Sequence, residues 1–288
     1  MTSSTSKLYS YTFFIPAAIV YFLFFIAPTF LSFFFSLTVW TLSDWSFTGL
    51  DNFRIFLTEP SLNIGFRNSL VYAIATCALK VILGFLLAAF LCTDLKSKGF
   101  LRSIIYFPNI LSTIAVGIMF SSLMHPSRGL INTTLATIGI HGPDWLGDPK
   151  MALFSVVLVD VWKGVGIAMT IFIAGIQAIP QHYYEAIMID GGSSFHKLRF
   201  ITFPLSRSSM NSVIMLAFIG GIRSFDLIWV MTKGGPGFTS DLIASIIYKQ
   251  LQGGFYGIAT AGNVVLFFIV SLLAVPMYRY LTRVEVDL

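Results

Sequence analysis

The sequence predicts an all-α polytopic membrane protein with six transmembrane helices. Hydrophobic residues make up 56% of its 288 residues and charged residues only 11%, and the mean hydropathy is +0.82. A soluble domain of this size carries about 25% charged residues, so most of this chain is expected to lie in lipid. Backbone groups must pair within their own segment there, and a helix of about 20 apolar residues is needed to cross the hydrocarbon.

Six long apolar runs are the expected spans. The first is too long for the core of a signal peptide and lacks a small-residue cleavage pattern, so we expect it to be retained as a helix. Pro16 and Pro28 are expected to bend or shorten that helix. The six runs are 12–39, 68–93, 103–123, 151–179, 209–231 and 258–280.

The distribution of basic residues predicts the orientation. Cytoplasmic segments of membrane proteins collect Lys and Arg. If the N-terminus lies inside, bases outnumber acids in the inner segments and equal them in the outer segments. Both termini are therefore expected to be cytoplasmic, with residues 1–11 as a cytoplasmic N-terminus and residues 12–288 as a single transmembrane domain. The net charge of +5 is assigned to orientation and not to nucleic-acid binding.

A polar island, residues 180–208, separates the fourth and fifth runs and is expected to face the cytoplasm. Its first half predicts a short helix from His182 to Asp190. Gly191-Gly192 should end that helix, because glycine accepts the positive φ of a sharp turn.

The second half of the island predicts another short helix. Ser193 or Ser194 is a natural N-cap, and Pro204 limits the helix. Three apolar residues recur at three-residue spacing: Phe195, Leu198 and Ile201. This helix–turn–helix is too charged for the bilayer and too small to bury its apolar face, so it is expected to dock in a cleft of another protein. The alternative is an ordinary inter-helix loop, although loops of this length are usually functional.

Two pairs of charges lie within the predicted spans. Asp160 and Lys163 are three residues apart in the fourth run, as are Arg223 and Asp226 in the fifth. Each pair can form an ion pair on one helix face. Ionisable residues in spans are costly and usually functional, and these four have similar predicted depths. They are expected to share one aqueous cavity, although inter-helix pairing without solute contact is the alternative.

The island resembles the EAA loop of ABC importer permeases, whose pattern is Glu-Ala-Ala-x3-Gly-x9-Ile-x-Leu-Pro. Ile187 and Phe203 replace the second Ala and the Leu. The resemblance implies that the island inserts into an ATPase subunit, with Glu185 and Gly191 at key coupling positions. The coupling residues implied in this way are Glu185, Ala186, Asp190, Gly191, Ile201 and Pro204.

Further segments are similar to the sugar-importing, maltose-transporter-like branch of these permeases. They are residues 144–149, 161–164, 175–180 and 232–236, the last being the Gly-Gly-Pro outer loop. The chain lacks the extra N-terminal spans and the external domain of the maltose subunit. It therefore looks like the shorter six-span permeases for oligosaccharides, related sugars or glycerol phosphate.

The resemblance also implies a fold, a location and partners. The fold is that of a type I ABC importer permease in a bacterial or archaeal plasma membrane, which moves a sugar or oligosaccharide and is not itself an enzyme. Its partners are a second, different permease, two ATPase subunits and an extracytoplasmic sugar-binding protein. The chain has no Gly-x4-Gly-Lys-Ser/Thr loop. ATP and Mg²⁺ are thus expected in the ATPase, and no cofactor in this chain.

The sugar contacts that the resemblance carries over fall on the fourth and fifth runs. They are Asp160, Lys163, Gly164, Ile167, Ala217 and Gly221. Gly164 leaves room for a ligand or for close helix packing. Trp162 can stack on a sugar face or serve only for packing, and Asn263 and Asn109 are weaker candidates. Lys80 is expected to be structural or to line the cavity.

Two other classes of protein remain as alternatives. An ion-coupled secondary transporter would usually show internal repeats, and none is convincing here. An intramembrane enzyme would need a metal cluster or a Ser/His pair in its spans, and the four histidines all lie in predicted loops.

Overall fold

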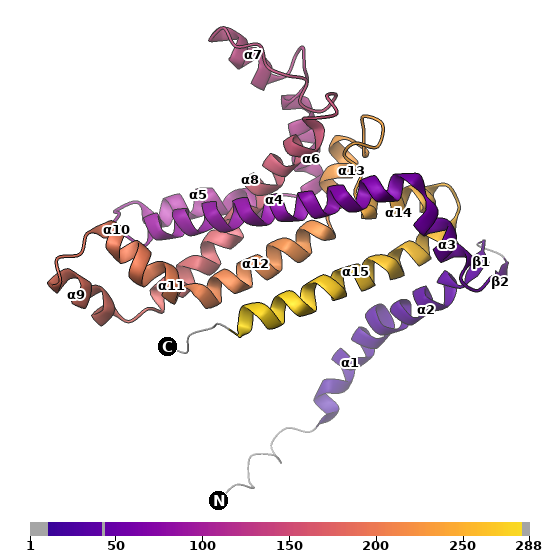
Figure 1. Ribbon diagram of the computed structural model, residues 1–288, viewed down its shortest axis with the longest axis horizontal. Coiled ribbons are helices and arrows are strands. Elements are labelled where there is room, and N and C mark those ends of the chain that lie inside the picture. Colours follow the sequence, from indigo (N-terminus) through magenta and orange to yellow (C-terminus); the bar gives the residue numbers. More distant parts are fainter. Residues whose placement is uncertain (1–10, 42–43, 284–288) are drawn as a thin grey trace, which may run out of the picture. The chain divides into compact units, whose positions relative to one another are not determined.

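The computed structural model describes residues 11–41 and 44–283, and most of them are helical (Figure 1). The predicted cytoplasmic N-terminus, apart from residue 11, lies outside the described residues. The chain forms two compact units, and each is described by itself. The first comprises residues up to 59 together with 247–267, and the second comprises 60–246 together with the residues from 268 onward.

The first unit opens with the helix expected as the first span. After the 3-10 turn η1 (Tyr11–Phe14) the helix is continuous from Ile15 to Ser36, as α1 (Ile15–Tyr21), the π-helix η2 (Phe22–Ile26) and α2 (Ala27–Ser36). Pro16 lies in the first turn, where its missing N–H has no helical partner to lose. Pro28 lies in the first turn of α2, two residues after the π-helix ends at Ile26. A π turn changes the hydrogen-bond register, which accommodates a residue that cannot donate. The prolines therefore shape this helix without ending it.

A short β-hairpin in the first unit departs from the all-α prediction. β1 (Thr38–Trp40) pairs antiparallel with β2 (Trp45–Phe47). Their β-branched and aromatic residues favour strands, a signal that the apolar runs obscured. α3 (Asp51–Thr58) follows, and Asn52 Nδ2 donates to the carbonyl oxygens of Ser36 and Thr38 at 3.0 and 2.7 Å. Asn52 thus satisfies the carbonyl that the end of α2 leaves unpaired at Ser36, and that of Thr38 at the start of β1.

The second unit is built around two long helices, α4 (Pro60–Leu91) and α8 (Ala152–Gln177), which pack against each other. α12 (Arg207–Ile222) lies along both of them, and α5 (Lys98–Ile110) lies against α8. α4 and α8 meet closely at Gly84, where a Cβ would lie 2.7 Å from that of Ala168. The fourth predicted span matches α8 within two residues, whereas α4 begins eight residues before the second predicted span, at a proline that suits a first helical turn.

The third predicted span is broken, which corrects the expectation of one straight helix over 103–123. α5 ends at Ile110 and α6 (Thr113–Leu123) continues at 96° to it. Pro108 lies inside the last turn of α5, where it withholds a backbone donor and crowds the preceding turn. Leu111 and Ser112 then adopt extended ψ values of 145° and 131°.

The fifth predicted span is also broken. α12 ends at Ile222, Arg223 is its C-cap, and a separate helix, α13, spans Asp226–Met231. Gly220-Gly221 precedes the break, and glycine is among the weakest helix formers. Arg223 and Asp226 therefore do not share one helix face, and no ion pair joins them in the described part of the chain.

The described residues contain between four and six spans by length and composition. Four are single helices: Ile15–Ser36, Pro60–Leu91, Ala152–Gln177 and Tyr256–Thr282, the last being α15. Two bent pairs bring the number to six if each pair is one span: Lys98–Ile110 with Thr113–Leu123, and Ser194–Leu205 with Arg207–Ile222. The second pair is bent by 66° and includes part of the predicted island.

The segment between α6 and α8 is ordered by a polar cluster. α7 (Leu130–Thr137) carries the buried Asn132, whose Nδ2 donates to the carbonyl oxygens of Pro126 and Pro143 at 3.0 Å. Trp145 Nε1 donates to Asn132 Oδ1 at 2.7 Å.

α14 (Ile243–Gln252) is the helix that precedes α15.

Candidate functional site

A polar cavity lies among the helices of the second unit. Its volume is about 210 Å³. Residues of α4, α5, α6, α8 and α12 line it: Lys80, Asn109, Thr113, Asp160, Lys163, Gly164, Ile167, Ala168, Ile171, Val213, Leu216 and Ala217. Five of the predicted solute-path residues meet here, namely Asp160, Lys163, Gly164, Ile167 and Ala217, and so does Asn109.

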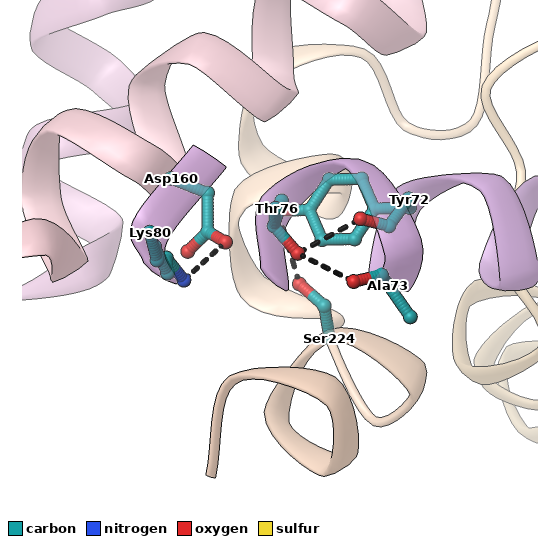
Figure 2. A network of polar contacts seen from close by, with 6 residues as sticks. All are labelled: Tyr72, Ala73, Thr76, Lys80, Asp160 and Ser224. Atoms are coloured by element: carbon teal, nitrogen blue, oxygen red, sulfur yellow. Dashed lines mark hydrogen bonds and ion pairs between the residues drawn. The ribbon is translucent and has the colours of Figure 1, made fainter. Parts of the chain in front are cut away.

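The ion pair in this cavity joins two helices. Lys80 Nζ donates to Asp160 Oδ2 at 2.7 Å, and the two side chains are 14% and 20% exposed (Figure 2). The expected pairing of Asp160 with Lys163 on one helix is therefore wrong. α4 packs directly on α8, so a cation from the neighbouring helix reaches the carboxylate. The sequence predicted Lys80 only as a structural or cavity-lining residue and not as the partner of Asp160, although Lys80 is the single charged residue of the predicted span 68–93.

The glycines of α8 make room for protein groups. A Cβ on Gly164 would lie 2.8 Å from Lys80 Cε, so of the two expected uses of this space, a ligand or close helix packing, the lysine side chain of the neighbouring helix takes the second. A Cβ on Gly166 would lie 2.8 Å from both the carbonyl oxygen of Ile105 and Tyr106 Cα. Close packing on α4 and α5 is therefore what these two glycines permit.

Gly166→Val is expected to push α5 away from α8 and to widen the cavity. The added side chain meets the α5 backbone, which cannot move aside as a flexible side chain can. Overpacking of this kind costs about 1–3 kcal/mol. The thermal unfolding midpoint of the purified protein should fall, whereas Gly220→Val is the matched control because a Cβ there meets nothing within 4 Å. Equal midpoints for the two variants would contradict the assigned packing.

The break between α5 and α6 supplies the uncharged polar lining. Asn109 precedes it and Thr113 follows it, and both reach the cavity. They provide an amide and a hydroxyl, each of which can donate and accept hydrogen bonds. Together with the charged groups and an aliphatic wall, the lining suits a solute that has hydroxyl groups and an apolar face.

A second set of polar contacts continues along α4 from the ion pair. Thr76 Oγ1 donates to the carbonyl oxygen of Tyr72 at 2.8 Å, and Ser224 Oγ donates to the Tyr72 hydroxyl at 3.4 Å (Figure 2). Ser224 belongs to the break between α12 and α13. The Tyr72 hydroxyl therefore attaches that break to α4.

Five predicted solute-path residues are not among the lining residues of this cavity. Trp162 packs edge-on against Phe120, with ring centroids 5.1 Å apart. Gly221 packs on Ala73 of α4. Arg223 and Asp226 are exposed beyond the end of α12, and Asn263 belongs to the first unit. The expectation of one cavity for all four intramembrane charges is thus wrong, because the fifth span breaks before Arg223 and Asp226.

The first half of the island has the predicted structure. α9 (Gln181–Ile189) ends with Asp190 as its C-cap, and the following Gly191 has a φ of +75°. Ser193 caps the next helix in a capping box with His196, the Ser193 Oγ and His196 Nδ1 being 2.7 Å apart. Tyr184 Oη lies 3.2 Å from Thr202 Oγ1, a hydrogen bond that joins the two halves.

The second half of the island ends where predicted but differs from the prediction in its apolar face. α10 (Ser194–His196), the π-helix η3 (Lys197–Thr202) and α11 (Phe203–Leu205) are consecutive and end at Leu205, one residue past Pro204, so the predicted limit at Pro204 is confirmed. Leu198 packs against the buried cluster around Phe172, and Ile201 is half-buried. The expected stripe therefore does not form one exposed face.

Phe195 of the expected stripe is exposed on the island, together with apolar side chains outside the stripe. Ile189 is 86% exposed and Phe195 is 63% exposed, and Met188 and Phe200 are exposed as well. Glu185, Ala186, Asp190, Gly191 and Pro204 also lie at the surface. In Figure 1, α9, α10 and α11 lie at the end of the second unit where α4 leads into α5, well away from α7. The island thus presents a mixed apolar and charged surface beyond the packed helices.

Comparisons with known proteins agree with this architecture. The chain is 33% identical over 262 residues to the trehalose/maltose transport system permease protein MalF of Thermococcus litoralis, covering 90% of this chain and 89% of the relative. It is 28% identical to the multiple sugar-binding transport system permease protein MsmF of Streptococcus mutans, covering 98% of each. In fold it matches a crystal structure of a bacterial ABC transporter involved in the import of the acidic polysaccharide alginate, with a TM-score of 0.84, 21% identity and coverage of 95% and 94%.

A family model defines the membership. Residues 80–284, which include the cavity and the island, match the model for the inner membrane component of binding-protein-dependent transport systems. The chain belongs to this family of ABC transporter permease subunits, which are not themselves enzymes.

Proposed function

We propose that this chain is the transmembrane permease subunit through which a binding-protein-dependent ABC importer moves a sugar or oligosaccharide into the cell. The observation that carries this proposal is the cavity, in which an inter-helix ion pair, a second lysine, an amide and a hydroxyl lie among apolar spans. Ionisable groups at such positions mark solute paths. The names of the sugar permeases MalF and MsmF supply the class of solute.

The proposed topology has six spans, with each bent pair counted as one, in a single transmembrane domain over residues 12–288. Both termini face the cytoplasm of a bacterium or archaeon, as does the island. The excess of basic residues in the inner segments supports this orientation. The separation of α7 from α9 in Figure 1 is also consistent with opposite membrane faces for the two segments.

The proposed assembly contains a second, different permease, two ATPase subunits that bind ATP and Mg²⁺, and an extracytoplasmic sugar-binding protein. The island inserts into an ATPase subunit, so closure of the ATPases moves α8 and α12, which flank the island in the chain. The cavity then switches between inward-facing and outward-facing states. The exposed apolar side chains of the island support this role, because nothing within its own helices covers them.

Reconstitution tests the proposal directly. The chain is expected to co-purify with an ATPase and a companion permease, and proteoliposomes that hold the complex should accumulate labelled oligosaccharide only with ATP and the binding protein present. A proton or sodium gradient should not replace ATP. Uptake by the chain alone, driven by such a gradient, would contradict the proposal and favour a secondary transporter.

A further inference from the structure

The solute cavity holds one more cation than acid. Its charged lining consists of Lys80, Lys163 and Asp160, two cations against one carboxylate and hence a net charge of +1. The Lys80 ammonium and the Asp160 carboxylate neutralise each other at 2.7 Å. Lys163 carries the excess charge.

The positions of the two lysines are not equivalent. The Lys80 side chain lies across Gly164, with its Cε 2.8 Å and its Nζ 3.0 Å from the position of a Cβ there. It is therefore held against the α8 backbone while it donates to Asp160. Lys163 is half-buried and has no ion-pair or hydrogen-bond partner among residues 11–41 and 44–283.

A half-buried ammonium within a span needs a counter-charge, because its desolvation is otherwise uncompensated. Around Lys163 the cavity also offers Asn109 and Thr113 for hydroxyl groups, and Ile167 and Leu216 for an apolar ring face. These groups together describe a sugar with an anionic substituent.

We propose that the solute of this permease is an anionic sugar, bearing a carboxylate or a phosphate, and that its anionic group pairs with Lys163. The inference rests on the proposed function and narrows its class of solute. Lys163 is the residue that gives preference for the anion, and the Lys80–Asp160 pair keeps the remaining charges neutral.

The test measures equilibrium binding to the assembled importer in nanodiscs without the binding protein, so that the permease alone selects. The probes are galacturonate with galactose, and glucose 6-phosphate with glucose. We expect at least one anionic probe to bind about tenfold more tightly than its neutral counterpart, as a single added ion pair gives in a partly solvated site. Which anionic probe binds more tightly distinguishes a carboxylate from a phosphate.

Substitutions of Lys163 locate the preference. Lys163→Gln should remove the anion preference, Lys163→Arg should retain it, and Lys96→Gln, an exposed lysine between α4 and α5, is the matched control. Equal affinities of the wild-type importer for anionic and neutral probes would overturn the inference. It would also fall if Lys163→Gln lowered the yield of assembled importer but left the ratio of affinities unchanged, since the counter-charge would then be a carboxylate of the companion subunit.

ATP-driven uptake by the wild-type importer distinguishes a failure of this inference from a failure of the proposed function. Uptake of neutral sugars without uptake of anionic ones leaves the proposed function intact and overturns the anionic solute. Absence of ATP-driven uptake of every sugar overturns the proposed function itself.

Discussion

Gly191→Pro and Glu185→Lys are each expected to reduce ATP-driven uptake at least about a hundredfold while the protein stays in the membrane. Gly191 has a φ of +75°, and proline is restricted to a φ near −65°. The turn between α9 and α10 cannot form in that variant, so the exposed surface of the island is lost. Glu185 is exposed on α9, and its replacement reverses a charge at the proposed ATPase contact without disturbing the packed helices. Uptake in proteoliposomes is the measurement.

Two milder variants serve as controls for the island. A Cβ on Gly191 meets nothing within 4 Å, so Gly191→Ala carries only the backbone strain of a positive φ, about 1–2 kcal/mol. It should retain measurable uptake. Gln181→Lys places a lysine at another exposed position of α9, a charge change of +1 against +2 for Glu185→Lys, and should transport normally. Normal uptake by both Gly191→Pro and Glu185→Lys would rule out a coupling role for the island.

The sequence predicted the parts of this fold that depend on local chemistry. Long apolar runs have one stable structure in lipid, so α8 lies within two residues of its prediction. The turn at Gly191 and the cap at Ser193 follow from glycine's access to positive φ and from a serine that can accept a backbone N–H. Local signals of this kind need no knowledge of neighbouring helices.

The breaks in the third and fifth spans were missed because hydropathy does not register them. Pro108 was visible, but prolines are tolerated in membrane helices when neighbouring groups satisfy the freed backbone. Pro28 illustrates that tolerance, since its helix continues through a π turn. Whether a proline bends, breaks or is absorbed depends on tertiary contacts that no local pattern contains.

The sequence predicted many of the residues that line the cavity but not which of them pair, because the pairing also depends on tertiary contacts. The i, i+3 spacing of Asp160 and Lys163 suggested a pair within one helix, but the partner of Asp160 comes from α4, 80 residues earlier in the chain. The sequence left open whether Gly164 makes room for a ligand or for close helix packing, and its space is filled by Lys80. Residue types identified the site, whereas helix packing determined which charges meet.

Asp160→Asn is expected to destabilise the protein more than Lys80→Met does. The first change leaves two lysines in the cavity without a carboxylate, whereas the second leaves Asp160 within reach of Lys163 one turn along α8. Removal of one partner of a buried pair costs about 3–5 kcal/mol, and the partial exposure of these side chains places Asp160→Asn near 3 kcal/mol. Lys80→Met should cost about half as much if Lys163 takes over the pairing. Unfolding of the purified protein monitored by tryptophan fluorescence gives both values.

The double variant shows whether the ion pair itself produces this asymmetry. Asp160→Asn with Lys80→Met leaves Lys163 alone and restores the net charge of +1, so it should be more stable than Asp160→Asn by itself. Groups in direct contact give interaction energies of about 0.5–3 kcal/mol in such cycles. If the two substitutions add independently, or if Lys80→Met is the more damaging, then Lys80 and Asp160 do not stabilise each other as their 2.7 Å contact implies. If Lys163 takes over the pairing with Asp160 in Lys80→Met, then adding Lys163→Gln to that variant should lower its stability further. The combined variant leaves Asp160 as the uncompensated charge.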